Sequence, residues 1–115
     1  MLVAPTIADY CHCRTCQQLT GTPASVWAQV PIAAFRYTLG EPAIYASSAT
    51  GERRFCQLCA SPIEHRRRPD PTTVEFFVGT LDDPSQVAPK VPIFTQSRIP
   101  WFDTTDALPR LQQFS

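Results

Sequence analysis

Apolar and polar residues alternate along much of this chain, which is the pattern of β-strands with one buried face. The alternation is clearest in segments 26–30 and 73–78, where the even-numbered apolar residues are expected to face the core. Weaker alternation predicts further strands at 35–38, 43–47, 53–56 and 63–67. Segments 48–51 and 68–71 are rich in turn-forming residues and predict hairpin connections.

Helices are expected only as short pieces. Twelve prolines, spread from Pro5 to Pro109, interrupt every stretch long enough for an ordinary helix. A helix of one or two turns is predicted at 16–20, closed by Gly21, and another after Asp83, which would cap it. The sequence therefore predicts a mainly β fold with short helical turns, in a single domain over residues 1–115.

Net charge and the length of the apolar runs argue against two classes of partner. The 115 residues carry 10 Lys and Arg against 10 Asp and Glu, so the formal net charge is zero. The run Arg66-Arg67-Arg68 is best interpreted as a solvated strand end that discourages edge-to-edge pairing. No apolar run approaches the roughly 20 residues that span a bilayer. We therefore expect neither nucleic acid nor a membrane as a partner.

The five cysteines fall in two tight clusters, Cys11-His12-Cys13-Arg14-Thr15-Cys16 and Cys56-Gln57-Leu58-Cys59. Tetrahedral zinc takes thiolate sulfurs, and a C-x-x-C turn lets two sulfurs converge on one ion. In an extended C-x-C segment the first and third side chains share a face, so Cys11 and Cys13 are expected to point together and His12 away from them. The candidate zinc ligands are Cys11, Cys13, Cys16, Cys56 and Cys59.

Other uses of these cysteines fit the sequence less well. A set of paired disulfides needs an even count and an oxidising compartment, whereas the count is odd and Met1–Tyr10 lacks the pattern of a signal peptide. A cytoplasmic, reducing setting is expected. A thioredoxin-like redox pair at Cys56 and Cys59 would precede a helix, which Ser61-Pro62 disfavours. His12 could support a metal ligand, although lone histidines on strands more often serve packing.

Longer motifs give the chain a family resemblance. Cys11-His12-Cys13-Arg14-Thr15-Cys16 runs on into Gln17-Gln18-Leu19-Thr20-Gly21, and matching stretches follow in the same order over nearly the whole chain. These stretches are Trp27, Phe35-Arg36-Tyr37-Thr38-Leu39-Gly40-Glu41-Pro42 with Tyr45, Phe55-Cys56-Gln57-Leu58-Cys59-Ala60-Ser61-Pro62, Gly79-Thr80-Leu81-Asp82-Asp83-Pro84, Ser97-Arg98-Ile99-Pro100-Trp101 and Leu108-Pro109. The chain resembles the glutathione-dependent formaldehyde-activating enzyme family, which also contains the centromere protein V domain.

The resemblance implies an antiparallel β-tent that binds two zinc ions. It also implies the addition of glutathione to formaldehyde, formally a carbon-sulfur lyase reaction written in reverse. By position, Cys11, Cys13 and Cys16 match the catalytic three-cysteine site. Cys56 and Cys59 match half of a four-cysteine structural site.

The chain departs from the family pattern in two places. The family opens with a C-x-C-G strand that supplies two structural ligands, and no such motif precedes Tyr10, so we expect an N-terminally short domain. The sheet edge left by missing strands predicts a homo-oligomer. In addition, Gln17 and Gln18 replace basic residues that are common after the third cysteine.

Two functions are consistent with these motifs. A zinc ion held by Cys11, Cys13 and Cys16 would keep one position open for a small thiol such as glutathione, whose attack on a small aldehyde is carbon-sulfur lyase chemistry in reverse. Alternatively, Cys56 and Cys59 could close one four-thiolate site with two of the first three cysteines. The protein would then be a non-catalytic, zinc-stabilised binding or scaffold module.

Overall fold

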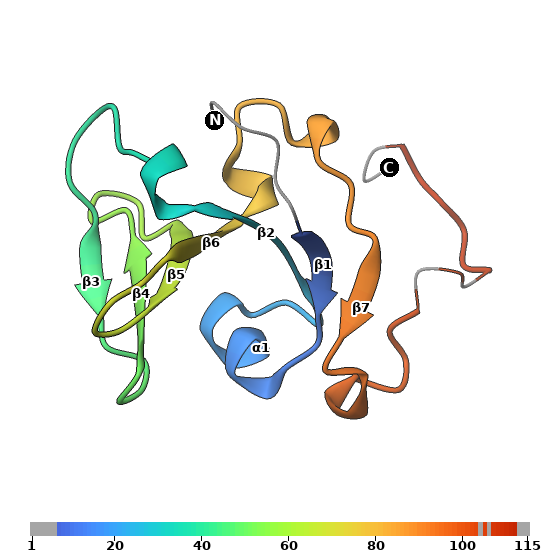
Figure 1. Cartoon of the computed structure of the whole chain (residues 1–115). Helices are drawn as coiled ribbons and strands as arrows, with labels where there is room; N and C mark the ends of the chain where they lie inside the picture. The colour runs from blue at the N-terminus through green and yellow to red at the C-terminus, as the bar shows by residue number, and fades with distance from the viewer. Residues whose placement is uncertain (1–6, 104, 106, 113–115) are drawn as a thin grey trace.

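The computed structural model describes residues 7–103, 105 and 107–112, which form a sheet of seven strands in the order β3-β4-β5-β6-β2-β1-β7 (Figure 1). The strands are β1 (Ile7–Cys11), β2 (Ser25–Pro31), β3 (Ala43–Tyr45), β4 (Gly51–Phe55), β5 (Pro62–Arg67), β6 (Thr73–Phe77) and β7 (Val91–Ile93). The helical elements are α1 (Arg14–Thr20) and the 3-10 turns η1 (Ile32–Ala34), η2 (Val78–Thr80), η3 (Pro84–Gln86) and η4 (Thr95–Ser97). The predicted mainly β fold with short helices is confirmed.

Neighbouring strands pair antiparallel except at one edge of the sheet. Both hairpins predicted from the turn segments are present, as β3 with β4 and β5 with β6. At the other end β7 runs parallel to β1, in the register Asp9 with Val91 and Cys11 with Ile93. The alternation did not predict β7, because it is three residues long and has Pro92 at its centre. Proline lacks the N–H that a central strand needs, and β7 is an edge strand.

One predicted strand, segment 35–38, is wrong. Phe35 instead closes η1, where its N–H donates to the carbonyl of Ile32. The aromatic rings of this segment still pack inward, since the Phe35 ring lies 5.8 Å from that of Phe76 and 5.6 Å from that of Tyr37. The alternation therefore reflects side chains that pack on the sheet, although the backbone of this segment does not pair with a strand.

Both faces of the central strands β2 and β6 are buried. On one face the core contains Ala8, Ala28, Val30, Val74, Phe76 and Val78. On the other face a smaller buried cluster joins Trp27 and Phe77 to two cysteines, Cys11 and Cys16. Trp27 and Phe77 are register partners on β2 and β6, with ring centroids 3.7 Å apart. This second cluster places two cysteines against a rigid aromatic wall.

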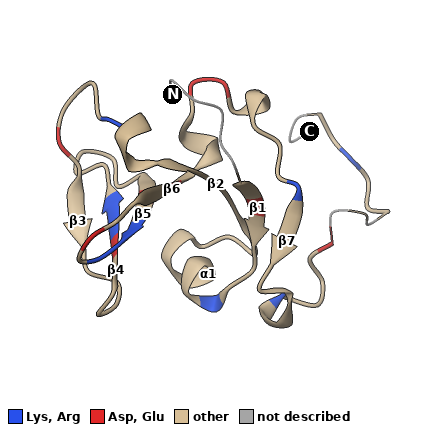
Figure 2. Cartoon of the chain, viewed as in Figure 1, with Lys and Arg blue, Asp and Glu red and all other residues tan. Residues whose placement is uncertain are grey.

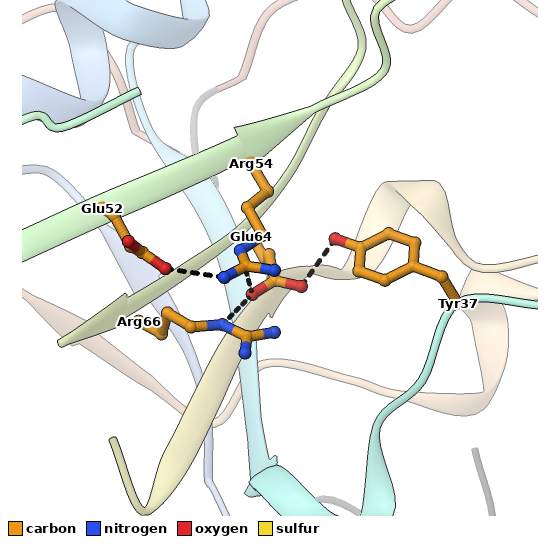
Figure 3. A network of polar contacts seen from close by, with 5 residues as sticks. All are labelled: Tyr37, Glu52, Arg54, Glu64 and Arg66. Atoms are coloured by element: carbon orange, nitrogen blue, oxygen red, sulfur yellow. Dashed lines mark hydrogen bonds and ion pairs between the residues drawn. The ribbon is translucent and has the colours of Figure 1, made fainter. Parts of the chain in front are cut away.

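A buried carboxylate ties the outer strands to the core. Glu64 on β5 is 1% exposed and lies opposite Arg54 of β4. It accepts hydrogen bonds from Tyr37 and from Arg66, and Arg54 also reaches Glu52 (Figure 3). Figure 2 shows that basic residues gather along β4 and β5. The ion pairs with Glu64 therefore offset part of the charge on these two strands.

The part of the chain that the structure describes contains no helix long and apolar enough to cross a membrane. Residues 1–6, which belong to the segment without a signal-peptide pattern, lie outside the described residues.

Candidate metal centre

The junction between β1 and α1 brings three cysteines together. β1 ends at Cys11 and α1 begins at Arg14, and Cys13 between them has an extended backbone, so the chain changes direction after the C-x-C segment. Cys13 caps α1, since its Sγ accepts a hydrogen bond of 3.4 Å from the backbone N–H of Cys16. Gly21 ends the helix with φ of 73°, a left-handed conformation that glycine adopts without strain. The helix starts two residues earlier than predicted because a cysteine takes the capping position.

The geometry of the three sulfurs suits a tetrahedral metal. The Sγ atoms of Cys11, Cys13 and Cys16 all lie within 4.8 Å of one another. Those of Cys11 and Cys16 are 3.7 Å apart. Zinc–sulfur bonds of about 2.3 Å in a tetrahedron separate the sulfurs by about 3.8 Å. The three thiols therefore fit three corners of a zinc site, and this cluster could hold a metal ion.

Negative charge in this cluster concentrates on Cys16. Hydrogen bonds from Cys11 and Cys13, together with the Arg53 guanidinium, lower the pKa of the Cys16 thiol well below its usual range. The hydrogen bond to Cys16 and then burial raise the pKa of Cys11, whereas burial is the larger cause of the raised pKa of Cys13. The Nη2 atom of Arg53 lies 3.7 Å from Cys16 Sγ. Cys16 is thus the sulfur that carries a thiolate first.

A cavity of about 250 Å³ opens beside the three sulfurs. It is lined by Ile7, Asp9, Cys11, Cys13, Cys16, Trp27, Ala28, Gln29, Arg53, His65, Arg67, Glu75, Ile93 and Phe94. Its walls therefore come from both halves of the sheet, and they combine apolar side chains with ionisable ones. A small molecule in this cavity would contact the sulfurs directly.

Three ionisable residues of the cavity, Asp9, His65 and Glu75, are shifted towards their neutral forms. Burial is the main reason that the pKa values of Asp9 and Glu75 are raised, and the charge at Cys16 adds to both. Burial and the neighbouring Arg53 lower the pKa of His65. The cavity thus disfavours unpaired charge on these three residues, and Arg53 and Arg67 are its fixed cations.

Cys56 and Cys59 lie outside this cluster. They follow β4 in a turn, where Cys56 is half-buried and Cys59 is exposed. Cys59 Sγ lies 3.1 Å from Ser61 Oγ, and hydrogen bonding to Ser61 lowers the pKa of Cys59. Among the described residues, the group of metal-ligating atoms contains only Cys11, Cys13 and Cys16. The structure therefore does not bring the two predicted cysteine clusters into one site.

His12 faces away from the sulfurs, as the extended C-x-C geometry predicted. It is 5% exposed, lies 5.9 Å from the Phe102 ring, and lines a different cavity together with Tyr10. Its Nδ1 atom is buried without a hydrogen-bond partner. His12 therefore does not belong to the ligand group.

Gln17 has a role that the sequence did not reveal. Its buried side-chain amide donates to the carbonyls of His12 at 2.9 Å, Pro23 at 3.3 Å and Ser97 at 3.1 Å. It thereby fastens the cysteine turn to the segment after β7. Basic residues are common at this position in the family that the chain resembles, whereas the contacts of Gln17 are structural.

Arg53 is the second residue that the sequence did not single out. Alternation along β4 places Arg53 and Arg54 on opposite faces, but only the sheet order shows which face meets the cysteines. The Arg53 guanidinium lies 5.6 Å from the centroid of the Trp27 ring, which is also part of the cavity wall.

Comparison with known proteins identifies the fold and the family of this chain. Among solved structures, the crystal structure of a Rhodobacter sphaeroides protein is similar with a TM-score of 0.58 and 23% identity, over 76% of this chain and 80% of that chain. At that identity the likeness concerns the fold alone. No curated protein matches the chain. The model of one family, described as glutathione-dependent formaldehyde-activating enzyme, matches residues 1–97. The chain therefore belongs to the glutathione-dependent formaldehyde-activating enzyme family, whose membership associates it with activity on glutathione and formaldehyde.

Proposed function

We propose that this protein is a zinc-dependent catalyst of the reversible addition of a small thiol, such as glutathione, to a small aldehyde. The observation that carries the proposal is the convergence of Cys11, Cys13 and Cys16 beside a cavity of about 250 Å³. Three protein ligands with space beside them are the arrangement of a catalytic zinc site, whereas structural sites are closed by four.

Bound zinc would supply Lewis acidity, which turns a thiol with a pKa near 8.5 into a thiolate at neutral pH. The roles of the protein residues follow from their places. Cys11, Cys13 and Cys16 would hold the ion, and Cys13 is the least buried of the three. The apolar wall of Trp27 and Ile93 would keep water from the reacting carbon. This chemistry requires reduced cysteines, so a cytoplasmic setting is part of the proposal.

The bonds balance without any oxidant or reductant. In the forward direction the thiol loses its proton to solvent, and its sulfur forms a bond to the carbonyl carbon. The π bond of the carbonyl breaks, and its oxygen takes up a proton to become a hydroxyl group. The reverse direction breaks the carbon-sulfur bond and is the lyase reaction.

The alternative, a non-catalytic binding or scaffold module, requires a closed four-thiolate site. Cys56 and Cys59 would have to complete it, yet they are not in the ligand group that contains Cys11, Cys13 and Cys16. This separation supports the open site. It leaves Cys56 and Cys59 as candidate ligands of a second ion.

Exchange spectroscopy by NMR tests the proposal, because it measures the rate at which glutathione and formaldehyde interconvert with their adduct at equilibrium. The zinc-loaded protein should raise this rate, and Cys13→Ser should abolish the increase. Thr15→Ser is a matched control, since Thr15 is exposed in the same turn of α1 and should leave the rate unchanged. Equal exchange rates with and without the zinc-loaded protein would reject catalysis in favour of the binding module.

A further inference from the structure

Arg53 has a buried guanidinium group whose hydrogen bonds are incomplete. Its Nε and Nη1 atoms are shielded from solvent and have no hydrogen-bond partner. A buried cation is costly unless an opposite charge lies close to it. The position of Arg53 therefore calls for a nearby anion.

The carboxylates of the cavity do not meet this need. Asp9 and Glu75 line the same cavity, but within the described part of the chain Arg53 forms no ion pair with either of them. Its polar contact is with Cys16, whose Sγ lies 3.7 Å from Nη2. The other side of the group packs over Trp27. The counter-charge that fits Arg53 is thus the thiolate of Cys16.

We propose that Arg53 is a positioning residue of the metal centre, which withdraws negative charge from Cys16 Sγ so that an incoming substrate thiolate, and not Cys16, is the reactive nucleophile. The inference rests on the proposed function, because it concerns sulfurs bound to zinc. The protein cysteines and the substrate would both present thiolates to the same aldehyde. In this role Arg53 determines which of these thiolates reacts.

The three protein sulfurs are protected in different ways. Cys13 Sγ accepts the backbone N–H of Cys16, and Cys16 Sγ accepts from Arg53. Cys11 and Cys16 are each only 4% exposed. A hydrogen-bond donor engages a lone pair of the thiolate sulfur and so lowers the nucleophilicity of that sulfur. Such charge-assisted hydrogen bonds are stronger than neutral ones. A zinc-bound substrate sulfur that receives no such donor would be more nucleophilic than a zinc-bound cysteine sulfur that does.

Alkylation of the zinc-loaded protein by iodoacetamide tests this role without any aldehyde or thiol substrate. In that reaction the thiolate displaces iodide and forms a thioether, and peptide mass mapping gives the rate at each cysteine. Arg53→Met should raise the alkylation rate at Cys16 about tenfold, with a smaller change at Cys11 and Cys13. A tenfold change corresponds to about 1.4 kcal/mol, within the range of a hydrogen bond to a charged group.

Arg67→Met is the matched control, because Arg67 lines the same cavity and is exposed, and the hydrogen bonds of the three described cysteines do not involve it. It should leave the Cys16 rate unchanged. An unchanged alkylation rate at Cys16 in Arg53→Met would overturn the proposal. An equal rise at all three cysteines would also overturn it, because that result indicates a general loosening of the site. If Arg53→Met does not fold, Arg53→Gln decides by the same criterion, because it removes the positive charge and keeps a polar side chain.

The outcome is separable from that of the proposed function. Failure to load zinc at Cys11, Cys13 and Cys16, seen by metal analysis, would reject both. A selective rise at Cys16 in a protein that does not accelerate adduct exchange would retain the role of Arg53 as protector of the ligand and reject catalysis alone.

Discussion

The hydroxyl group of Tyr37 donates a hydrogen bond of 2.6 Å to Oε2 of Glu64, whose side chain is completely shielded from solvent. Its other oxygen, Oε1, faces Arg66 and Arg54 (Figure 3). Both oxygens of a buried carboxylate are thereby satisfied by groups from three different segments. This arrangement joins the loop before β3 to the strands β4 and β5.

Replacing Glu64 should be strongly destabilising. Glu64→Gln leaves Arg66 without its counter-charge and removes one of the two carboxylates that pair with Arg54. Breaking a buried ion pair from one side costs about 3–5 kcal/mol. Urea denaturation should report this loss in the free energy of unfolding. Glu52→Gln is the control, because among the described residues Glu52 forms an ion pair with Arg54 alone, and this substitution should cost about 1 kcal/mol or less. Equal losses in the two variants would contradict this interpretation.

Tyr37 should make stability depend on alkaline pH. Burial, then the hydrogen bond to Glu64, raises the pKa of Tyr37, so the folded state holds this proton more tightly than the unfolded state. The resulting stabilisation is complete below the unfolded value, about pH 10, and is lost as pH rises through the folded pKa. Denaturation from pH 8 to pH 11 should therefore show a steeper loss of stability above about pH 10 in the native protein than in Tyr37→Phe. Parallel curves would be evidence against the effect.

Metal content should separate the two cysteine clusters. We expect Cys13→Ser to lose one equivalent of zinc, because Cys11 and Cys16 alone offer two ligands. A Cys56→Ser and Cys59→Ser double variant should keep that equivalent. Elemental analysis of both variants after dialysis checks the assignment. Loss of all zinc from the double variant would show instead that the clusters share one ion.

Sulfur coordination should increase when a thiol binds. In the double variant, X-ray absorption at the zinc edge should report three sulfurs and one lighter atom, and glutathione should bring the count to four. S-methylglutathione serves as the control, since its thioether cannot form a thiolate, and should leave the spectrum unchanged. A count of four sulfurs before any thiol is added would indicate a closed site.

Gln17 should matter more than its neighbour. Gln17→Leu removes the amide that donates to three carbonyls, and leaving buried acceptors unsatisfied costs about 1–3 kcal/mol. Gln18→Leu, at an exposed position of the same helix, should change the free energy of unfolding by less than about 0.5 kcal/mol. Thermal denaturation of both variants gives the comparison. Similar melting temperatures would contradict the role assigned to Gln17.

The sequence pattern predicted those features of the structure that depend on residues close together in the chain. Alternation located the strands around Ala28 and Phe76, and cysteine spacing located the sulfurs that converge at Cys11 and Cys16. These features follow from strand and turn geometry within a few residues. The single-domain boundaries and the homo-oligomer stay predictions.

Contacts between distant segments could not be predicted in this way. The approach of Arg53 to Cys16 requires the order of strands across the sheet, which alternation along β4 does not contain. The second buried face at Trp27 and Phe77 was hidden for the same reason, since both faces of a central strand are covered only when other elements pack on them. The strand predicted at 35–38 was wrong because alternating aromatic side chains can pack on the core without any pairing of the backbone in a sheet.

The parallel pairing of β7 with β1 also sets an order of assembly. The three cysteines lie within six residues near the start, whereas the N–H of His12 donates to the carbonyl of Ile93, about 80 positions later in the chain. Contacts of such long sequence separation form slowly, and during synthesis the N-terminal part leaves the ribosome first. The three sulfurs of a nascent chain can therefore come together before Ile93 is present to wall the cavity, and they are most open to oxidation in that interval.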